Sequence, residues 1–119
     1  MDKEELKRRT KKFAIDIIRL TELFPKSTAS YTIGKQIIRS GTSVAANYRS
    51  ALRAQSDAHF ISKLNIVLEE SDESLFWLEL ASESGLIAGE KVEMLTKEAV
   101  ELTAIFSASI KTMKRKINT

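Results

Sequence analysis

Small and apolar residues recur at steps of three and four along four long stretches of this chain, and this spacing constrains its fold most strongly. The last stretch shows it best, in Val92, Leu95, Ala99, Leu102, Phe106, Ser109 and Met113. Positions spaced in this way lie on one side of an α-helix. The pattern therefore predicts a helix with one buried stripe in each stretch.

Helix-breaking residues are sparse and separate the four stretches. The 119 residues include one proline and four glycines. Pro25 and the pair Gly85 and Gly89 mark two turns, because proline restricts the residue before it and glycine favours turns. A third boundary falls at Ser56 and Asp57, which are good helix caps. The predicted helices are residues 2–24, 30–53, 57–84 and 90–117.

Four helices of similar length with short connections favour an all-α fold, the antiparallel up-down-up-down four-helix bundle. A mass of 13.4 kDa suits a single domain over residues 1–119. The hydrophobic share of 43% is large enough to supply a core. Gly41, Ala45 and Ala46 are small, so we expect a neighbouring helix to approach residues 41–46 closely.

The composition excludes several classes of site. The chain has no cysteine and one histidine, His59, which excludes thiol catalysis and thiolate or histidine-rich metal sites. The Glu-x-x-His motifs of di-iron bundles and glycine-rich phosphate loops are also missing. We therefore expect no metal, no cofactor and no enzymatic activity. Without a long apolar run or a signal-peptide core, we expect a cytoplasmic protein with no membrane association.

Several large apolar residues lie beside the predicted stripes on all four helices. They are Ile15, Ile38, Ile66, Phe76, Trp77, Ile105 and Ile110. Scattered exposed apolar residues are common on protein surfaces. The recurrence on every helix favours a second apolar surface that packs against another subunit. Trp77 is then an anchor in the core or in that interface.

Charge is distributed unevenly along the chain. Residues 1–54 hold twelve Lys/Arg and five Asp/Glu, whereas residues 55–119 hold seven Lys/Arg and eleven Asp/Glu. Basic and acidic helices could pair within one subunit or between subunits. The basic half could also attract the phosphates of nucleic acid. The candidate nucleic-acid-binding residues are Lys7, Arg8, Arg9, Lys11, Lys12, Arg49 and Arg53.

Polar residues also form columns on the two middle helices. Arg39, Ser43 and Asn47 are spaced by four residues and share one helix face. Glu69, Glu70 and Glu73 stand near the middle of the next helix. If the columns face each other, these six residues form a half-buried polar network that sets the helix register. A functional polar pocket is the alternative.

The chain resembles a bacterial four-helix bundle family, the 23S rRNA intervening-sequence proteins. The resemblance rests on three motifs, which are Gln36-Ile37-x-Arg39-Ser40-x-x-Ser43-Val44-x-x-Asn47, Arg53-x-x-Ser56-x-x-x-Phe60 and Glu70-x-x-Glu73-x-x-x-Trp77-Leu78. It implies an up-down-up-down bundle and a homo-oligomer, commonly a ring-shaped pentamer. The family's name refers to the genomic location of its genes and specifies no activity.

These observations lead to two functional hypotheses. The first is a non-enzymatic, oligomeric helical bundle that binds nucleic acid, namely RNA, or an RNA-associated partner through its basic face. The second is a protein–protein interaction scaffold with no nucleic-acid role. Dependence of RNA binding on salt and on the basic side chains separates the two.

Overall fold

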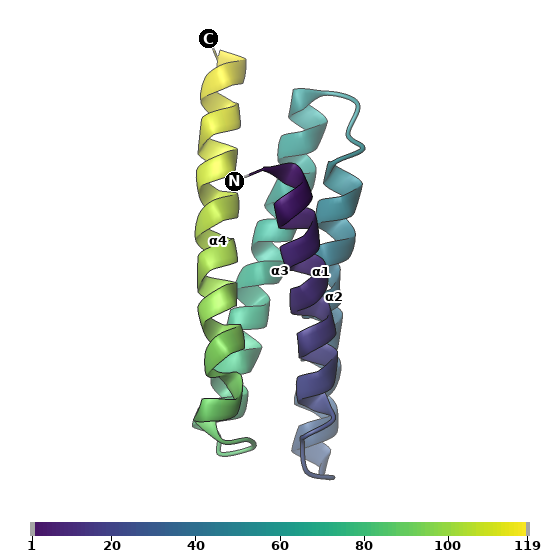
Figure 1. Ribbon diagram of the computed structural model, residues 1–119, viewed down its shortest axis with the longest axis vertical. Coiled ribbons are helices and arrows are strands. Elements are labelled where there is room, and N and C mark those ends of the chain that lie inside the picture. Colours follow the sequence, from purple (N-terminus) through teal and green to yellow (C-terminus); the bar gives the residue numbers. More distant parts are fainter. Residues whose placement is uncertain (1, 119) are drawn as a thin grey trace.

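The computed structural model describes residues 2–118, which form a bundle of helices joined by short connections (Figure 1). The helices are α1 (Lys3–Thr21), α2 (Thr28–Ala51), α3 (Asp57–Glu83) and α4 (Gly89–Asn118). Consecutive helices run in opposite directions, and the molecule measures 52 × 21 × 20 Å. The predicted all-α up-down-up-down bundle is confirmed.

Three of the helices begin at a residue that caps them. The side chains of Asp2, Ser27 and Ser56 each accept a hydrogen bond from the backbone N–H three residues later, at 2.7, 3.0 and 3.1 Å. Such a bond satisfies one of the N–H groups that have no partner inside the helix. Because Ser27 is the cap, α2 begins at Thr28, two residues earlier than predicted.

The helix ends follow from backbone geometry. α1 ends at Thr21, three residues earlier than predicted, because the N–H groups of Leu23 and Phe24 bond to carbonyls only three residues back. This tighter turn leads into Pro25, which disfavours a helical residue before it. After α3, Gly85 has φ of 78°, a conformation that other residues rarely adopt.

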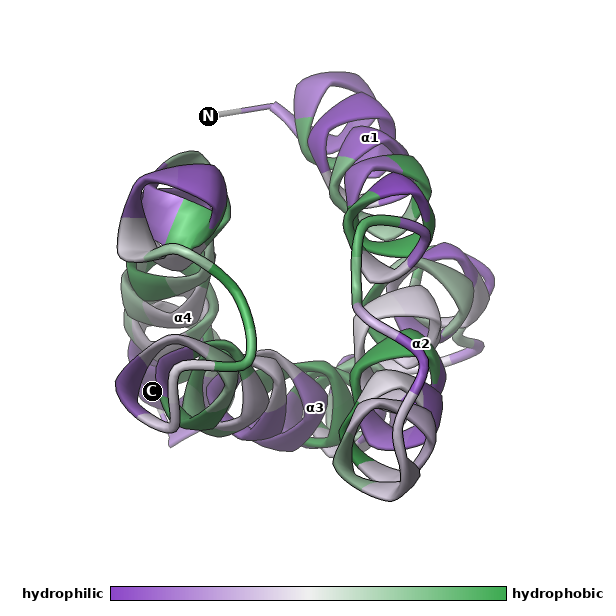
Figure 2. Ribbon diagram, turned by 90° about the horizontal axis from the view of Figure 1, so that it is seen from below, coloured by the Kyte–Doolittle hydropathy of each residue, from purple (hydrophilic) through white to green (hydrophobic). Residues whose placement is uncertain are grey.

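The core runs along the bundle axis and receives large side chains from all four helices. Figure 2 shows the hydrophobic residues on the helix sides that face inward. The largest fully buried apolar side chains are Phe13, Ile17, Ile37, Val44, Leu64, Val67, Leu78, Leu102 and Phe106. The helix stripes predicted from spacing therefore account for most of this core.

The end of the α4 stripe differs from the prediction. After Phe106 the buried position is Ile110, which is 5% exposed, whereas Ser109 and Met113 are half-buried. A straight helix has 3.6 residues per turn, so a stripe repeating every 3.5 residues drifts around it. Ile110 therefore belongs to the core, and the prediction that it lies beside the stripe is wrong.

We use the word seam for the line of contact between two adjacent helices. Small residues bring neighbouring helices close together along three of the four seams. Gly41 of α2 lies against Ile17 of α1, where an added Cβ would be 2.9 Å from the Ile17 Cγ1. Between α2 and α3, the buried Ser74 hydroxyl donates to the Ser40 hydroxyl at 3.0 Å. The spacing of helices depends on the size of the side chains between them. These residues therefore allow a close approach of α1 to α2 and of α2 to α3.

The seam between α3 and α4 follows the same rule. The hydroxyls of Ser71 and Thr103 are hydrogen bonded at 2.7 Å, and Thr103 also donates to the Ala99 carbonyl. The sequence pattern placed Ser71 and Ala99 on the predicted buried stripes of their helices. It did not predict the contact made by Thr103. Buried hydroxyls with partners cost little, so small polar residues can serve as close-packing positions.

The fourth seam, between α1 and α4, is different. Figure 2 shows α1 and α4 standing apart, whereas α2 and α3 each lie between two neighbours. Arg9 crosses this seam and reaches Glu98 at 2.5 Å and Glu101 at 3.1 Å. The hydrogen bond from Arg9 to Glu98 raises the pKa of the guanidinium.

We predict that Gly41→Ala destabilises the protein and that Gly34→Ala does not. A Cβ at position 41 collides with the stiff, fully buried Ile17 side chain, and overpacking of this kind costs about 1–3 kcal/mol. At position 34 the nearest side-chain atom, on Phe24, is 3.7 Å away. There alanine should add up to about 1 kcal/mol through helix propensity. Urea unfolding of both variants tests this, and equal effects would contradict it.

We predict that Arg9→Met lowers the free energy of unfolding by about 1–3 kcal/mol, because two carboxylates lose a charged partner. The Arg9 side chain is 13% exposed, so solvent cannot fully replace it. The matched variant Lys12→Met breaks an exposed pair with Asp16 and should cost at most about 1 kcal/mol. Chemical denaturation compares them, and a larger effect for Lys12 would refute the role of Arg9.

Candidate nucleic-acid interface

The α1–α2 hairpin brings two groups of predicted basic residues to one end of the bundle. α1 starts at this end and α2 finishes there, beside the start of α3 and the end of α4 (Figure 1). Arg8, Lys11, Arg49 and Arg53 are exposed, and Lys7 is half-buried. Within residues 2–118, these five side chains form no ion pair, so their charges face solvent.

The C-terminal part of α4 adds positive charge to the same end. It carries Lys111, Lys114, Arg115 and Lys116. Lys116 lies 3.7 Å from Asp57 at the start of α3. The sequence separates this run from the basic first half by more than 50 residues of acidic character, and only the antiparallel topology unites them. We refer to these residues together as the basic end, which comprises Lys7, Arg8, Lys11, Arg49, Arg53, Lys111, Lys114, Arg115 and Lys116.

Carboxylates also occupy the basic end. Asp2 caps α1, and Glu4 and Glu5 lie in its first turn, where acids favour the positive end of the helix dipole. Two of these carboxylates affect the pKa of the buried Tyr48 of α2. Burial first, and then the charges of Asp2 and Glu4, raise the pKa of its hydroxyl to about 12. The effect of Asp2 and Glu4 reflects the position of the start of α1 beside the end of α2.

Two other predicted basic residues have different surroundings. Arg9 turns toward α4 and pairs with Glu98 and Glu101, so it belongs to the α1–α4 contact and not with the exposed basic side chains. Lys12 is exposed but pairs with Asp16 one turn later at 2.6 Å. Phosphate binding would require both side chains to exchange an existing partner.

The predicted polar network exists in part. Arg39 of α2 contacts Glu70 at 3.2 Å and also pairs with Glu73, both on α3. Gln36 accepts from the Arg39 Nε at 3.1 Å, and the Trp77 indole N–H donates to Glu73 at 2.9 Å. The chain of contacts ties α2 to α3 on the outside of the bundle.

The other three predicted members do not join this network. Asn47 donates to the Ser43 carbonyl of its own helix at 2.9 Å, so neither residue reaches the carboxylates. Glu69 is exposed and forms no ion pair within residues 2–118. Helical spacing alone does not separate the two cases, because Glu69 and the paired Glu73 are four residues apart and share one side of α3.

The off-stripe apolar residues fall into two groups. Ile15, Ile38, Ile66 and Phe76 are exposed, with exposed fractions of 36–53%. Ile105 and Trp77 are half-buried and pack against the core, and the Phe76 ring meets Trp77 edge-on with centroids 4.9 Å apart. The exposed members lie on α1, α2 and α3, and the packing of another subunit against them stays a prediction.

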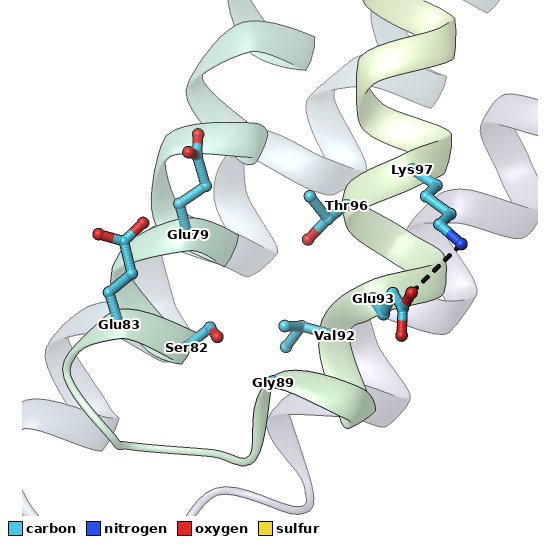
Figure 3. Close-up of a pocket in the computed structure, with 8 residues that line it drawn as sticks. All are labelled: Glu79, Ser82, Glu83, Gly89, Val92, Glu93, Thr96 and Lys97. Atoms are coloured by element: carbon cyan, nitrogen blue, oxygen red, sulfur yellow. Dashed lines mark ion pairs between the residues drawn. The ribbon is translucent and has the colours of Figure 1, made fainter.

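A shallow cleft of about 470 Å³ lies near the α3–α4 connection (Figure 3). Glu79 and Glu83 enter from α3, and Glu93 from α4 pairs with Lys97 at 3.2 Å. Figure 3 shows the α3 carboxylates well apart from Glu93. Among residues 2–118, no group of three or more His, Cys, Asp or Glu side chains is arranged to hold a metal ion.

The α-helices of the described chain include none that combines the length and apolar character needed to cross a membrane. The helices instead combine one buried stripe with charged outer faces. Fold and surface together define a four-helix bundle with ion-paired helix contacts and a basic end.

Comparison with known proteins places this bundle in a family. The profile of the 23S rRNA-intervening sequence proteins matches residues 3–108. The chain therefore belongs to the 23S rRNA-intervening sequence protein family, as its motifs indicated. No curated protein matches the chain significantly.

A solved structure supports the same assignment. It is the crystal structure of a protein of unknown function from the S23 ribosomal protein family of Bacteroides thetaiotaomicron. The two sequences are 38% identical, and the match covers 89% of this chain and 98% of the other. The TM-score of 0.83 shows that the two proteins share one fold.

We predict that Tyr48 makes the protein sensitive to alkaline pH. The folded pKa of about 12 exceeds the unfolded value of about 10. The contribution of Tyr48 to the free energy of unfolding is therefore fully present below about pH 10 and is lost as pH rises toward 12. Tyr48→Phe should make the fall in unfolding free energy shallower by up to about 1.4 kcal/mol per pH unit. Urea unfolding at several pH values measures it. The exposed Tyr31→Phe control should retain the parental slope, and an unchanged slope for Tyr48→Phe would refute the effect.

Proposed function

We propose that this protein is a non-enzymatic, homo-oligomeric bundle that binds RNA through the basic end. The observation that carries the proposal is the convergence of Lys7, Arg8 and Lys11 with Arg49 and Arg53, all without ion-pair partners in residues 2–118. Unpaired cations at one end attract a polyanion and gain affinity by releasing its counterions.

The same chemistry favours the RNA backbone over specific bases. Aromatic side chains that could stack on bases are scarce beside these cations, since Tyr48 is buried and the Lys3 ammonium lies over the Phe60 ring, 5.2 Å from its centre. Base-specific reading of RNA usually depends on stacking and on contacts to base edges. Binding through the basic end should therefore depend on phosphates and salt, with little sequence preference.

Self-association and cellular location are further parts of the proposal. The exposed Ile15, Ile38, Ile66 and Phe76 supply apolar area for contact with other copies. The family resemblance points to a pentameric ring, which would multiply the basic ends and raise the avidity for RNA. We propose that the assembly acts in the cytoplasm.

A protein-interaction scaffold is the second candidate. The observation in its favour is the Phe76–Trp77 pair beside the Arg39–Glu73 ion pair, because aromatic and arginine side chains are enriched at protein interfaces. This surface lies on α2 and α3 and does not include the basic end. The two candidate functions therefore use different surfaces of the molecule.

We predict that the triple variant Lys7→Glu, Arg8→Glu, Lys11→Glu loses RNA binding. The probe is a labelled single-stranded RNA of about 20 nucleotides, measured by fluorescence polarisation at 50–200 mM salt. The parent should bind more weakly as salt rises, with a slope that reflects several phosphate contacts. The triple variant should bind at least about tenfold more weakly, because three contacts become repulsive.

The matched control is Lys26→Glu, Lys35→Glu, Lys91→Glu, which changes net charge equally on exposed residues away from the basic end. It should retain most of the parental affinity. Equal loss in both variants would show that net charge alone governs binding. A parent protein that ignores RNA at low salt would refute RNA binding and favour the scaffold.

A further inference from the structure

The open seam between α1 and α4 contains a groove of about 720 Å³. Its floor includes the buried Phe13, Leu20 and Leu95. Its rims carry Leu23 in the turn after α1 and Met94 on α4, which are 61% and 76% exposed. Large apolar side chains exposed on both sides of an apolar floor are typical of a surface that a partner covers.

Ion pairs close one end of this groove and neutralise its acidic side chains. Arg9 bridges to Glu98 and Glu101 at the end nearer the start of α1. The remaining acid of the lining, Asp16, pairs with Lys12. Each carboxylate that lines the groove therefore already has a cationic partner.

The opposite end of the groove carries uncompensated positive charge. Arg19 near the end of α1 and Lys91 near the start of α4 line it, and neither forms an ion pair within residues 2–118. The other cation of the α4 side, Lys97, already pairs with Glu93. An occupant of the groove would therefore meet an apolar floor and two free cations at its open end.

The dimensions of the groove favour a helix as its occupant. The lining of α4 extends from Lys91 to Glu101, ten steps that measure about 15 Å at 1.5 Å per residue. A small ligand would need to be largely enclosed, whereas both rims here stand open to solvent. A helix is about 10 Å wide and can cover both rims with side chains spaced by three and four residues.

We propose that the α1–α4 groove binds an amphipathic helix of a partner protein, about three turns long, whose acidic residues pair with Arg19 and Lys91. Such a helix completes the open side of the bundle as a fifth helix. This site is separate from the basic end proposed to bind RNA. It is also separate from the exposed apolar residues on the outer faces of α1, α2 and α3.

A designed peptide tests the proposal directly. The probe is a fluorescein-labelled, alanine-rich helix of about 18 residues, long enough for partial helicity in water, with leucines at i, i+3, i+7 and i+10 and glutamates beside them. A second peptide keeps the leucines and replaces each glutamate with lysine. The full-length protein should bind the acidic peptide at least about tenfold more tightly than the basic one in fluorescence polarisation.

Variants in the groove then separate shape from charge. Met94→Ser and Leu23→Ser remove exposed apolar groups and should each weaken the acidic peptide by at least about fivefold, with no loss of folding. Val100→Ser is the matched control, because Val100 is 52% exposed on α4 outside the groove lining. It should leave peptide affinity unchanged.

Charge reversal completes the test. Arg19→Glu with Lys91→Glu should reverse the preference between the two peptides, whereas Lys26→Glu with Lys35→Glu, with the same change in net charge, should preserve it. Equal binding of both peptides by the parent, or no effect of Met94→Ser, would overturn the proposal. A change of mass in light scattering for Met94→Ser would also overturn it, by showing that a second copy covers the groove.

Discussion

The close contact of Gly41 with Ile17 determines how α1 lies on the rest of the bundle. Because position 41 has no side chain, α1 and α2 approach each other more closely than two large side chains allow. The serine pair between α2 and α3 and the Ser71–Thr103 pair between α3 and α4 shorten the next two seams. Three short seams in succession leave the fourth as the place where the square of helices stays open.

The charged residues of α1 have different roles, depending on whether they face the open seam. Arg9 and its two carboxylates hold α1 and α4 together at one point, so they act as structural groups even though Arg9 lies within a basic run. Its neighbours Arg8 and Lys11 are on other sides of the same helix and face solvent. Successive positions differ by 100° around a helix, so neighbouring cations in the sequence acquire different roles.

Helix positions and the composition of the core were accessible from the sequence because they depend on local rules. Spacing of three and four predicted most of the buried stripe on each helix, and Ser56 predicted the start of α3. Errors arose where short-range geometry changes, at the tight turn before Pro25 and in the drift of α4 toward Ile110. The family motifs that contain Arg39 and Trp77 could also be recognised, because they consist of residue types at fixed spacings in the sequence.

Partnerships across the bundle could not be predicted in the same way. The sequence alone determined a four-helix bundle with a basic first half, because periodicity and charge are properties of each segment. The tertiary structure decided that Arg39 meets Glu70 and Glu73 without Asn47, and that the C-terminal lysines join the basic end. It also decided that α1 and α4 leave a groove between them. These features depend on relative helix distance and rotation, which result from packing of side chains far apart in sequence.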